Sequence, residues 1–166
     1  MGISVEEASG QGGGKALKER RQMRSRVLIV DDDPAARKLA RDTLRLSGEE
    51  WDIWEADDGR SALNLIRAVK PDVVLLDITM PEVGGLPVCS EIKSDPVMRS
   101  TEIVIVSART ESDFIAASMQ AGASDYLTKP FQPADLLRRV RRVLRRDSGA
   151  DDPASADQPE ADTAGP

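Results

Sequence analysis

Residues 27–37, VLIVDDDPAAR, place three consecutive aspartates between a short apolar run and a segment that starts with proline. The apolar run is typical of a strand covered on both faces of a parallel sheet. Pro34 suits the first position of a helix, and Asp33 before it suits the N-cap. Asp31 and Asp32 would then follow the strand directly, at the end where α/β sheets form their sites. This stretch predicts an α/β fold with an acidic site.

Strand and helix signals continue to alternate outward from this stretch. Short apolar runs alternate with segments of helical periodicity that end near glycine or proline. Strands are expected at 27–30, 51–54, 72–76, 102–106 and 124–128, and helices at 34–46, 59–69, 86–93, 112–120 and 133–146. This alternation predicts right-handed βαβ units and a doubly wound, five-stranded parallel sheet with helices on both faces.

The composition restricts the available chemistry to carboxylates, hydroxyls, lysine and arginine. The 166 residues include no histidine and one cysteine, which excludes Ser-His-Asp catalysis, histidine zinc sites and internal disulfides. The cysteine, Cys89, is expected in the core. The net charge of −6 argues against general nucleic-acid binding, so nucleic acid is not an expected partner.

The two ends of the chain differ in composition from the middle. Residues 1–25 are glycine-rich and then basic, and they are expected to form a flexible extension. Residues 147–166 contain six acids and no lysine or arginine, which predicts a disordered acidic tail. The folded domain is expected at 26–146. Since no apolar run reaches membrane-spanning length and no signal peptide is recognisable, a cytoplasmic protein without membrane insertion is expected.

Polar side chains follow four of the five expected strands. Asp31 and Asp32 follow the first strand, Asp77 the third, Ser107 the fourth and Lys129 the fifth. A doubly wound sheet brings these strand ends to one edge. Carboxylates in one pocket repel each other, and Mg²⁺, which prefers oxygen ligands, relieves this repulsion. A cation and an ammonium around Asp77 would stabilise charge on a phosphoryl group, and the carboxylate can itself act as the nucleophile.

The folded region resembles the receiver domain of bacterial two-component response regulators. The resemblance rests on an ordered set of segments: VLIVDDDPAAR (27–37), VVLLDITMPEVGG (73–85), IKSDP (92–96), IVIVSA (103–108) and AGASDYLTKPF (121–131). It implies a flavodoxin-like topology with strand order 2-1-3-4-5. It also implies a phosphorylation switch that receives its phosphoryl group from a histidine kinase or a phosphotransfer protein. Such a switch is not an enzyme, apart from self-catalysed phosphotransfer and autodephosphorylation.

The resemblance assigns the phosphoryl chemistry to particular residues. Asp77 matches the aspartate that accepts the phosphoryl group, and Lys129 matches the lysine of the family site, which precedes a cis proline. Asp31 and Asp32 match the acidic pair that holds Mg²⁺, together with Asp77 and the backbone carbonyl of Thr79. Mg²⁺ is therefore the implied cofactor.

The resemblance assigns the conformational response to two further residues. Ser107 matches the switch hydroxyl that turns toward the phosphoryl group, and Tyr126 matches the aromatic residue that swings inward. The implied output surface consists of the helix at 112–120, the strand at 124–128 and the helix at 133–146. This surface would bind a downstream protein or a second copy of the chain. The short sequence that remains after the domain predicts a stand-alone receiver without an output domain.

Two other functions remain open on the residues alone. A haloacid-dehalogenase-type phosphatase would use Asp31 as its nucleophile, with Asp33 as its second acid. Ala35, where that motif has Thr or Val, counts against this alternative. A flavin- or nucleotide-binding domain of similar topology is opposed by the three acids after the first strand, which repel phosphate.

The last expected helix carries a row of arginines. We interpret this row as a solvated basic face. A partner surface, nucleic acid and a contact with the acidic tail remain as alternatives. The arginines are Arg138, Arg139, Arg141, Arg142, Arg145 and Arg146.

Overall fold

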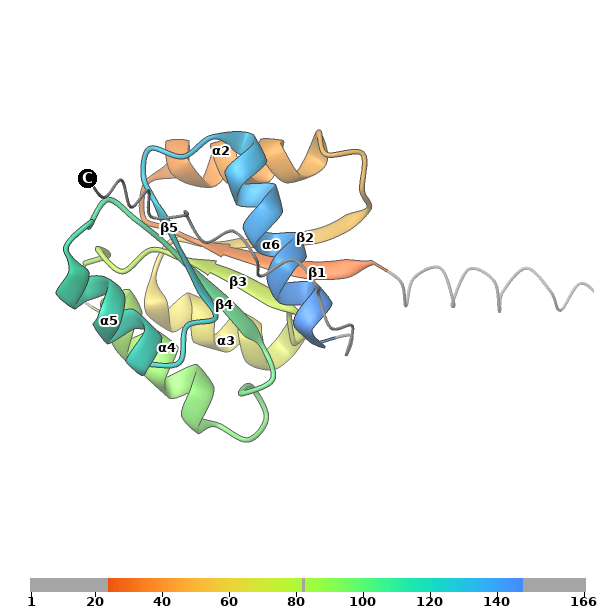
Figure 1. Ribbon diagram of the computed structural model, residues 1–166. Helices are drawn as coiled ribbons and strands as arrows, with labels where there is room; N and C mark the ends of the chain where they lie inside the picture. Colours follow the sequence, from red (N-terminus) through yellow and green to blue (C-terminus); the bar gives the residue numbers. More distant parts are fainter. Residues whose placement is uncertain (1–23, 82, 148–166) are drawn as a thin grey trace, which may run out of the picture.

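The computed structural model describes residues 24–81 and 83–147 (Figure 1). These residues form one five-stranded sheet with the order β2-β1-β3-β4-β5, and each neighbouring pair of strands is parallel. The predicted doubly wound sheet and its strand order are therefore confirmed. The expected N-terminal extension and acidic tail lie outside the described residues except at their inner ends.

Strands and helices alternate along the whole described domain. The strands are β1 (Ser25–Val30), β2 (Trp51–Ala56), β3 (Val73–Leu76), β4 (Glu102–Ser107) and β5 (Asp125–Thr128). The helices are α2 (Pro34–Arg45), α3 (Gly59–Val69), α4 (Gly85–Ser94), α5 (Ser112–Gln120) and α6 (Pro133–Asp147). Helices α3 and α5 have the predicted bounds. None of these helices is long and apolar enough to cross a membrane.

The largest differences from the predicted bounds occur where β1 pairs with β2. Strand β1 begins at Ser25, two residues before the apolar run at 27–30, and β2 continues to Ala56, two residues beyond the alternating segment at 51–54 that predicted it. The two strands pair in register over this whole length, from Ser25 with Trp51 to Val30 with Ala56. Backbone hydrogen bonds do not require apolar side chains, so pairing continues through the polar residues at the strand ends.

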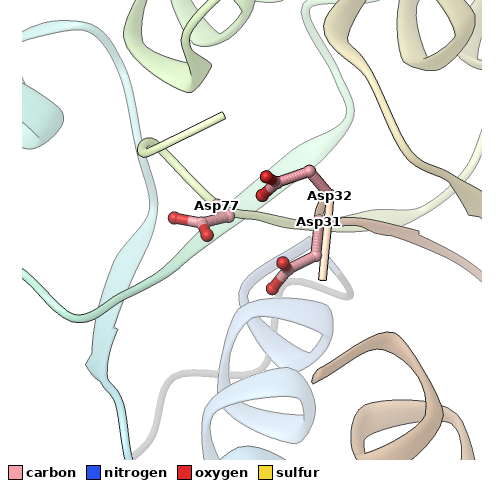
Figure 2. A group of neighbouring side chains, drawn as sticks. All are labelled: Asp31, Asp32 and Asp77. Atoms are coloured by element: carbon pink, nitrogen blue, oxygen red, sulfur yellow. The ribbon is translucent and has the colours of Figure 1, made fainter. Parts of the chain in front are cut away.

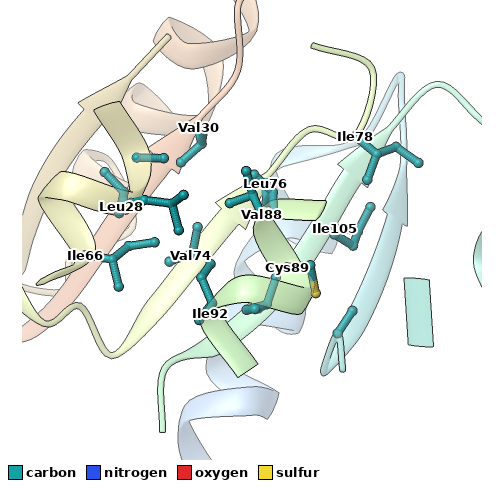
Figure 3. Packing of buried hydrophobic residues seen from close by; sticks show 14 of the residues in the cluster. Leu28, Val30, Ile66, Val74, Leu76, Ile78, Val88, Cys89, Ile92 and Ile105 are labelled. Atoms are coloured by element: carbon teal, nitrogen blue, oxygen red, sulfur yellow. The ribbon is translucent and has the colours of Figure 1, made fainter. Parts of the chain in front are cut away.

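Two hydrophobic clusters lie on opposite faces of the sheet. Successive strand residues point to opposite sides, so Leu28 and Val30 belong to one cluster and Val27 and Ile29 to the other. Helices α3, α4 and α5 cover the first face of the sheet, and α2 and α6 cover the second (Figure 1). Figure 3 shows the first of these clusters. Cys89 is fully buried in it, as predicted, and burial raises the pKa of its thiol to about 11. The two clusters hold the strand ends in fixed positions.

The basic helix α6 is joined to β5 by a buried carboxylate. Asp125 is 5% exposed and accepts hydrogen bonds from Arg139, at 2.7 Å, and from Arg142. Arg141 donates from Nε to Glu49 at 2.7 Å. The interpretation of a solvated basic face does not hold for Arg139, whose side chain is 29% exposed and bonded to a buried carboxylate. It agrees with Arg141 and Arg142, whose side chains are 39% and 45% exposed although both are paired.

Replacing Asp125 with asparagine is expected to lower the free energy of unfolding by about 2 kcal/mol, because two guanidinium groups lose their buried partner. The loss is smaller than for a fully buried pair, since the Arg142 side chain is 45% exposed. Asp135→Asn is the matched control, because its pair with Arg138 is exposed, and it should cost less than about 1 kcal/mol. Urea denaturation measures both, and equal losses would contradict the prediction.

Candidate functional site

The carboxyl ends of β1 and β3 lie side by side at one edge of the sheet. Val30 is in register with Leu76, so Asp31 and Asp77 each follow the strand end by one residue. The Asp77 N–H donates to the carbonyl of Val30 at 2.9 Å, and the Asp31 N–H donates to the carbonyl of Ala56 at 3.2 Å. The sheet backbone therefore positions both aspartates.

Three carboxylates gather at this edge, as the positions of the strand ends predict. One carboxylate oxygen from each of Asp31, Asp32 and Asp77 lies within 4.8 Å of the others (Figure 2). Asp31 and Asp77 are 5% and 4% exposed, whereas Asp32 is exposed to solvent. An all-oxygen donor set of this kind, partly open to water, suits Mg²⁺.

Lys129 reaches the acidic cluster from the end of β5. Its N–H donates to the carbonyl of Ser107 at 2.8 Å, and the peptide bond to Pro130 is cis, as the resemblance implies. Its Nζ lies 2.6 Å from Asp31 Oδ2 and 2.9 Å from Asp77 Oδ2. Burial alone would lower the pKa of Lys129, but the hydrogen bonds and charges of Asp31 and Asp77 outweigh it and raise the pKa. The structure thus brings Lys129 to the predicted site as a cation.

The charges at the site do not balance. Three carboxylates against one ammonium leave two negative charges when all four groups are ionised. Burial raises the pKa of Asp31, and this effect exceeds the lowering by Lys129 and by the N–H of Asp33. A divalent cation would supply the two missing positive charges, so the residues present fit Mg²⁺.

Both oxygens of Asp77 have partners. Oδ1 accepts from the Thr79 N–H at 2.9 Å and from the Thr79 hydroxyl at 2.7 Å, while Oδ2 faces Lys129. These contacts fix the rotation of the carboxylate in the pocket. The role of the Thr79 carbonyl as a metal ligand stays a prediction.

The two predicted switch residues are linked through the backbone of Arg109. The Arg109 N–H donates to Ser107 Oγ at 3.2 Å, and the Tyr126 hydroxyl donates to the Arg109 carbonyl at 2.7 Å. Ser107 is fully buried, and Tyr126 is 8% exposed and packs in the core. Burial raises the pKa of the Tyr126 hydroxyl. The sequence did not indicate this link through position 109.

Tyr126 also lines a hollow on the surface formed by α5, β5 and α6. The hollow has a volume of about 510 Å³ and combines apolar residues with charged ones. Its lining includes Ile115, Met119, Phe131 and Arg139. Tyr126 therefore connects the loop beside the acidic site with the surface that the resemblance assigns to output.

A contact with the acidic site that the sequence analysis missed comes from Arg37, in the second turn of α2. Its Nη1 donates to the backbone carbonyl of Asp31 at 2.6 Å. Contacts between a side chain and a carbonyl leave no pattern in a single sequence. The one available signal was the position of this arginine shortly after the acidic pair.

Comparisons with known proteins agree with this geometry. Residues 27–141 match the family described as the response regulator receiver domain. The chain is 39% identical over 132 residues to the DNA-binding response regulator MtrA of Mycolicibacterium smegmatis. It is 42% identical over 132 residues to the response regulator MprA of a Mycobacterium species. These matches cover 80% and 78% of this chain and 55% and 56% of the relatives, so the chain spans about half the length of the curated relatives it matches.

Solved structures with the same fold include response regulators. A putative response regulator from Chloroflexus aurantiacus has a TM-score of 0.70 at 32% identity, over 74% of this chain and 99% of that structure. The chemotaxis protein CheY4 of Vibrio cholerae has a TM-score of 0.67 at 30% identity, over 72% of this chain and 98% of that structure. The fold, the acidic edge of the sheet and the sequence relatives thus all point to the same family of proteins.

Proposed function

Because the chain belongs to the response regulator receiver domain family of two-component signalling, we propose that Asp77 accepts a phosphoryl group from a histidine kinase or a phosphotransfer protein. The observation that carries this proposal is the position of Asp77. Its carboxylate is buried, lies 2.9 Å from the ammonium of Lys129 and stands beside two further carboxylates. This is the environment expected of a nucleophilic carboxylate that works with a metal ion.

Each residue of the site has a part in the proposed transfer. A carboxylate oxygen of Asp77 attacks phosphorus, the bond from phosphorus to the donor nitrogen breaks, and an acyl phosphate forms on Asp77. Lys129 stabilises the charge on the phosphoryl oxygens, and Thr79 holds the carboxylate in position through Oδ1. Asp31, Asp32, Asp77 and the carbonyl of Thr79 would hold Mg²⁺, which would supply positive charge beside the phosphoryl oxygens.

The proposed response starts at Ser107. When its hydroxyl turns toward the new phosphoryl group, Ser107 Oγ moves away from the N–H of Arg109. The carbonyl of the same residue accepts the hydrogen bond of the Tyr126 hydroxyl, so this movement reaches Tyr126. The rearranged loop shifts the population of packings around Tyr126 and so changes the hollow on α5, β5 and α6. A downstream protein or a second copy of the chain binds this surface.

The remaining parts of the proposal concern the whole protein. The receiver acts in the cytoplasm as a switch and not as an enzyme on a separate substrate. The relative MtrA is described as DNA-binding, but this chain matches 55% of its length. The match therefore does not decide whether this chain binds nucleic acid, and the absence of a nucleic-acid partner stays a prediction. The stand-alone arrangement also stays a prediction, which the mass of the protein isolated from its source cells will test.

Labelling by radioactive acetyl phosphate tests the proposal directly. We expect the intact chain to incorporate one phosphoryl group in the presence of Mg²⁺ and none when EDTA removes the metal. The product should be sensitive to hydroxylamine, as an acyl phosphate is. Labelling that persists in EDTA, or a product that resists hydroxylamine, would rule out the proposed chemistry.

A further inference from the structure

Arg37 connects the acidic site to β2. It is the fourth residue of α2, and side chains of a helix lean toward its N-terminus, here toward the turn that carries the aspartates. Its Nη1 donates to the carbonyl of Asp31 at 2.6 Å, and its Nε lies 3.6 Å from Glu55 Oε2. The side chain is 18% exposed, so water competes little for these contacts.

The contact with Arg37 completes the restraint of Asp31. The N–H of Asp31 is bonded to Ala56, Oδ1 accepts from the N–H of Asp33 at 2.9 Å, and Oδ2 accepts from Lys129. The carbonyl lies one residue beyond the end of β1, and Arg37 supplies its donor. Each polar group of Asp31 is therefore held.

Asp32 differs from Asp31 in this respect. Its side chain is exposed, and within residues 24–81 and 83–147 no donor is bonded to its carboxylate. The position of this carboxylate is therefore set by the main chain to which it is attached and by its own side-chain torsions. The peptide group between Asp31 and Asp32 contains the carbonyl that Arg37 holds.

We propose that Arg37 is a positioning residue for the divalent cation: by holding the Asp31 carbonyl, it fixes the peptide plane that directs the Asp32 carboxylate toward Asp77. This inference rests on the magnesium site of the proposed function. Groups that orient metal ligands from behind commonly change metal affinity by about 10- to 100-fold when removed. We therefore expect the loss of this bond to weaken cation binding by about tenfold or more.

Arg41 provides a matched control. It lies one helical turn after Arg37, its side chain is similarly sheltered, and its Nη1 donates to Glu55 Oε1 at 2.7 Å. The two arginines thus share Glu55, but the bond to Asp31 belongs to Arg37. Replacing either one with methionine removes one positive charge near the site and keeps most of the aliphatic stem.

A purely electrostatic role and a positioning role of the arginine predict opposite changes in cation affinity. Removal of a positive charge alone should leave cation binding unchanged or slightly tighter, because the repulsion between the guanidinium and the cation disappears. Arg41→Met should therefore keep its affinity within about twofold of the wild type. Arg37→Met should bind the cation about tenfold more weakly. Arg37→Lys keeps the charge but not the planar fork, so it should also bind more weakly than the wild type.

Calorimetric titration of the full chain with Mg²⁺, and titration with Mn²⁺ followed by its electron paramagnetic resonance signal, measure this affinity without phosphorylation. Thermal unfolding without metal identifies the folded variants, and Arg37→Lys serves as the decisive variant if Arg37→Met does not fold. If folded Arg37 variants bind the cation with wild-type affinity, or if Arg41→Met weakens binding equally, this inference is overturned while the proposed function stands. A wild-type chain that binds neither cation would instead refute the magnesium site of the proposed function, and this inference with it.

Discussion

Asp77→Asn is expected to reduce labelling by acetyl phosphate below detection, while the protein stays folded. The amide retains the size of the carboxylate and can still accept from the Thr79 N–H, which lies 2.9 Å from Oδ1 in the wild type. It cannot form an acyl phosphate, because an amide oxygen lacks the charge of a nucleophilic carboxylate. Radioactive incorporation, or the mass of the intact chain after a long incubation, measures the outcome.

Asp31→Asn is the matched control for this experiment. It removes a carboxylate of the same pocket that is similarly buried and bonded to the same lysine. We expect slower labelling at a given Mg²⁺ concentration, because a proposed metal ligand is lost, but labelling should remain detectable at high Mg²⁺. The reverse pattern, in which only Asp31→Asn is unlabelled, would support the phosphatase alternative, in which Asp31 is the nucleophile. The match of residues 27–141 to receiver domains favours Asp77.

Gly85→Ala is expected to lower the free energy of unfolding by about 3 kcal/mol and to impair labelling. An added Cβ at this position would lie 2.2 Å from the carbonyl oxygen of Asp77 and 2.7 Å from the Cα of Ile78. Both are backbone atoms, so no side-chain rotation can relieve the clash. The loop that carries Asp77 would have to move, which changes the site as well as the stability.

Gly84→Ala is the neighbouring control. There the nearest atom to an added Cβ is the carbonyl oxygen of Ile78, at 3.4 Å, and the φ angle of −62° suits alanine. Alanine is a poorer N-cap than glycine but also reduces the entropy of the unfolded chain, so these effects offset each other to within about 1 kcal/mol. Urea denaturation and acetyl phosphate labelling are measured for both variants. If both were equally unstable, the close contact at Gly85 would not be the cause.

The sequence predicted the parts of the site that depend on strand ends. Apolar runs locate the strands, and parallel pairing brings their carboxyl ends together, so Asp31, Asp77 and Lys129 could be placed before any side chain was seen. The N-cap role of Asp33 was predicted from Pro34 and is confirmed, since its side chain accepts from the N–H of Ala35. These features follow from local rules and from topology.

Individual contacts of the arginine side chains could not be predicted in this way. The arginines of α6 had the spacing of a solvated face, yet Arg139 and Arg142 pair with Asp125, which precedes them by 14 and 17 positions. The bond from Arg37 to the carbonyl of Asp31 likewise depends on side-chain rotamers and on how the turn is folded. A hydrophobic pattern contains no information on side-chain rotamers or on the detailed conformation of a turn.

The link between Ser107 and Tyr126 uses only main-chain atoms of residue 109. Every amino acid except proline provides the same N–H and the same carbonyl there, so the identity of the side chain is not constrained by this relay. Because the proposed relay needs only the main chain at this position, the side chain can make a separate contact: the guanidinium carbon of Arg109 lies 3.7 Å from the centre of the Phe114 ring. Proline at this position would remove the N–H and with it the bond to Ser107 Oγ.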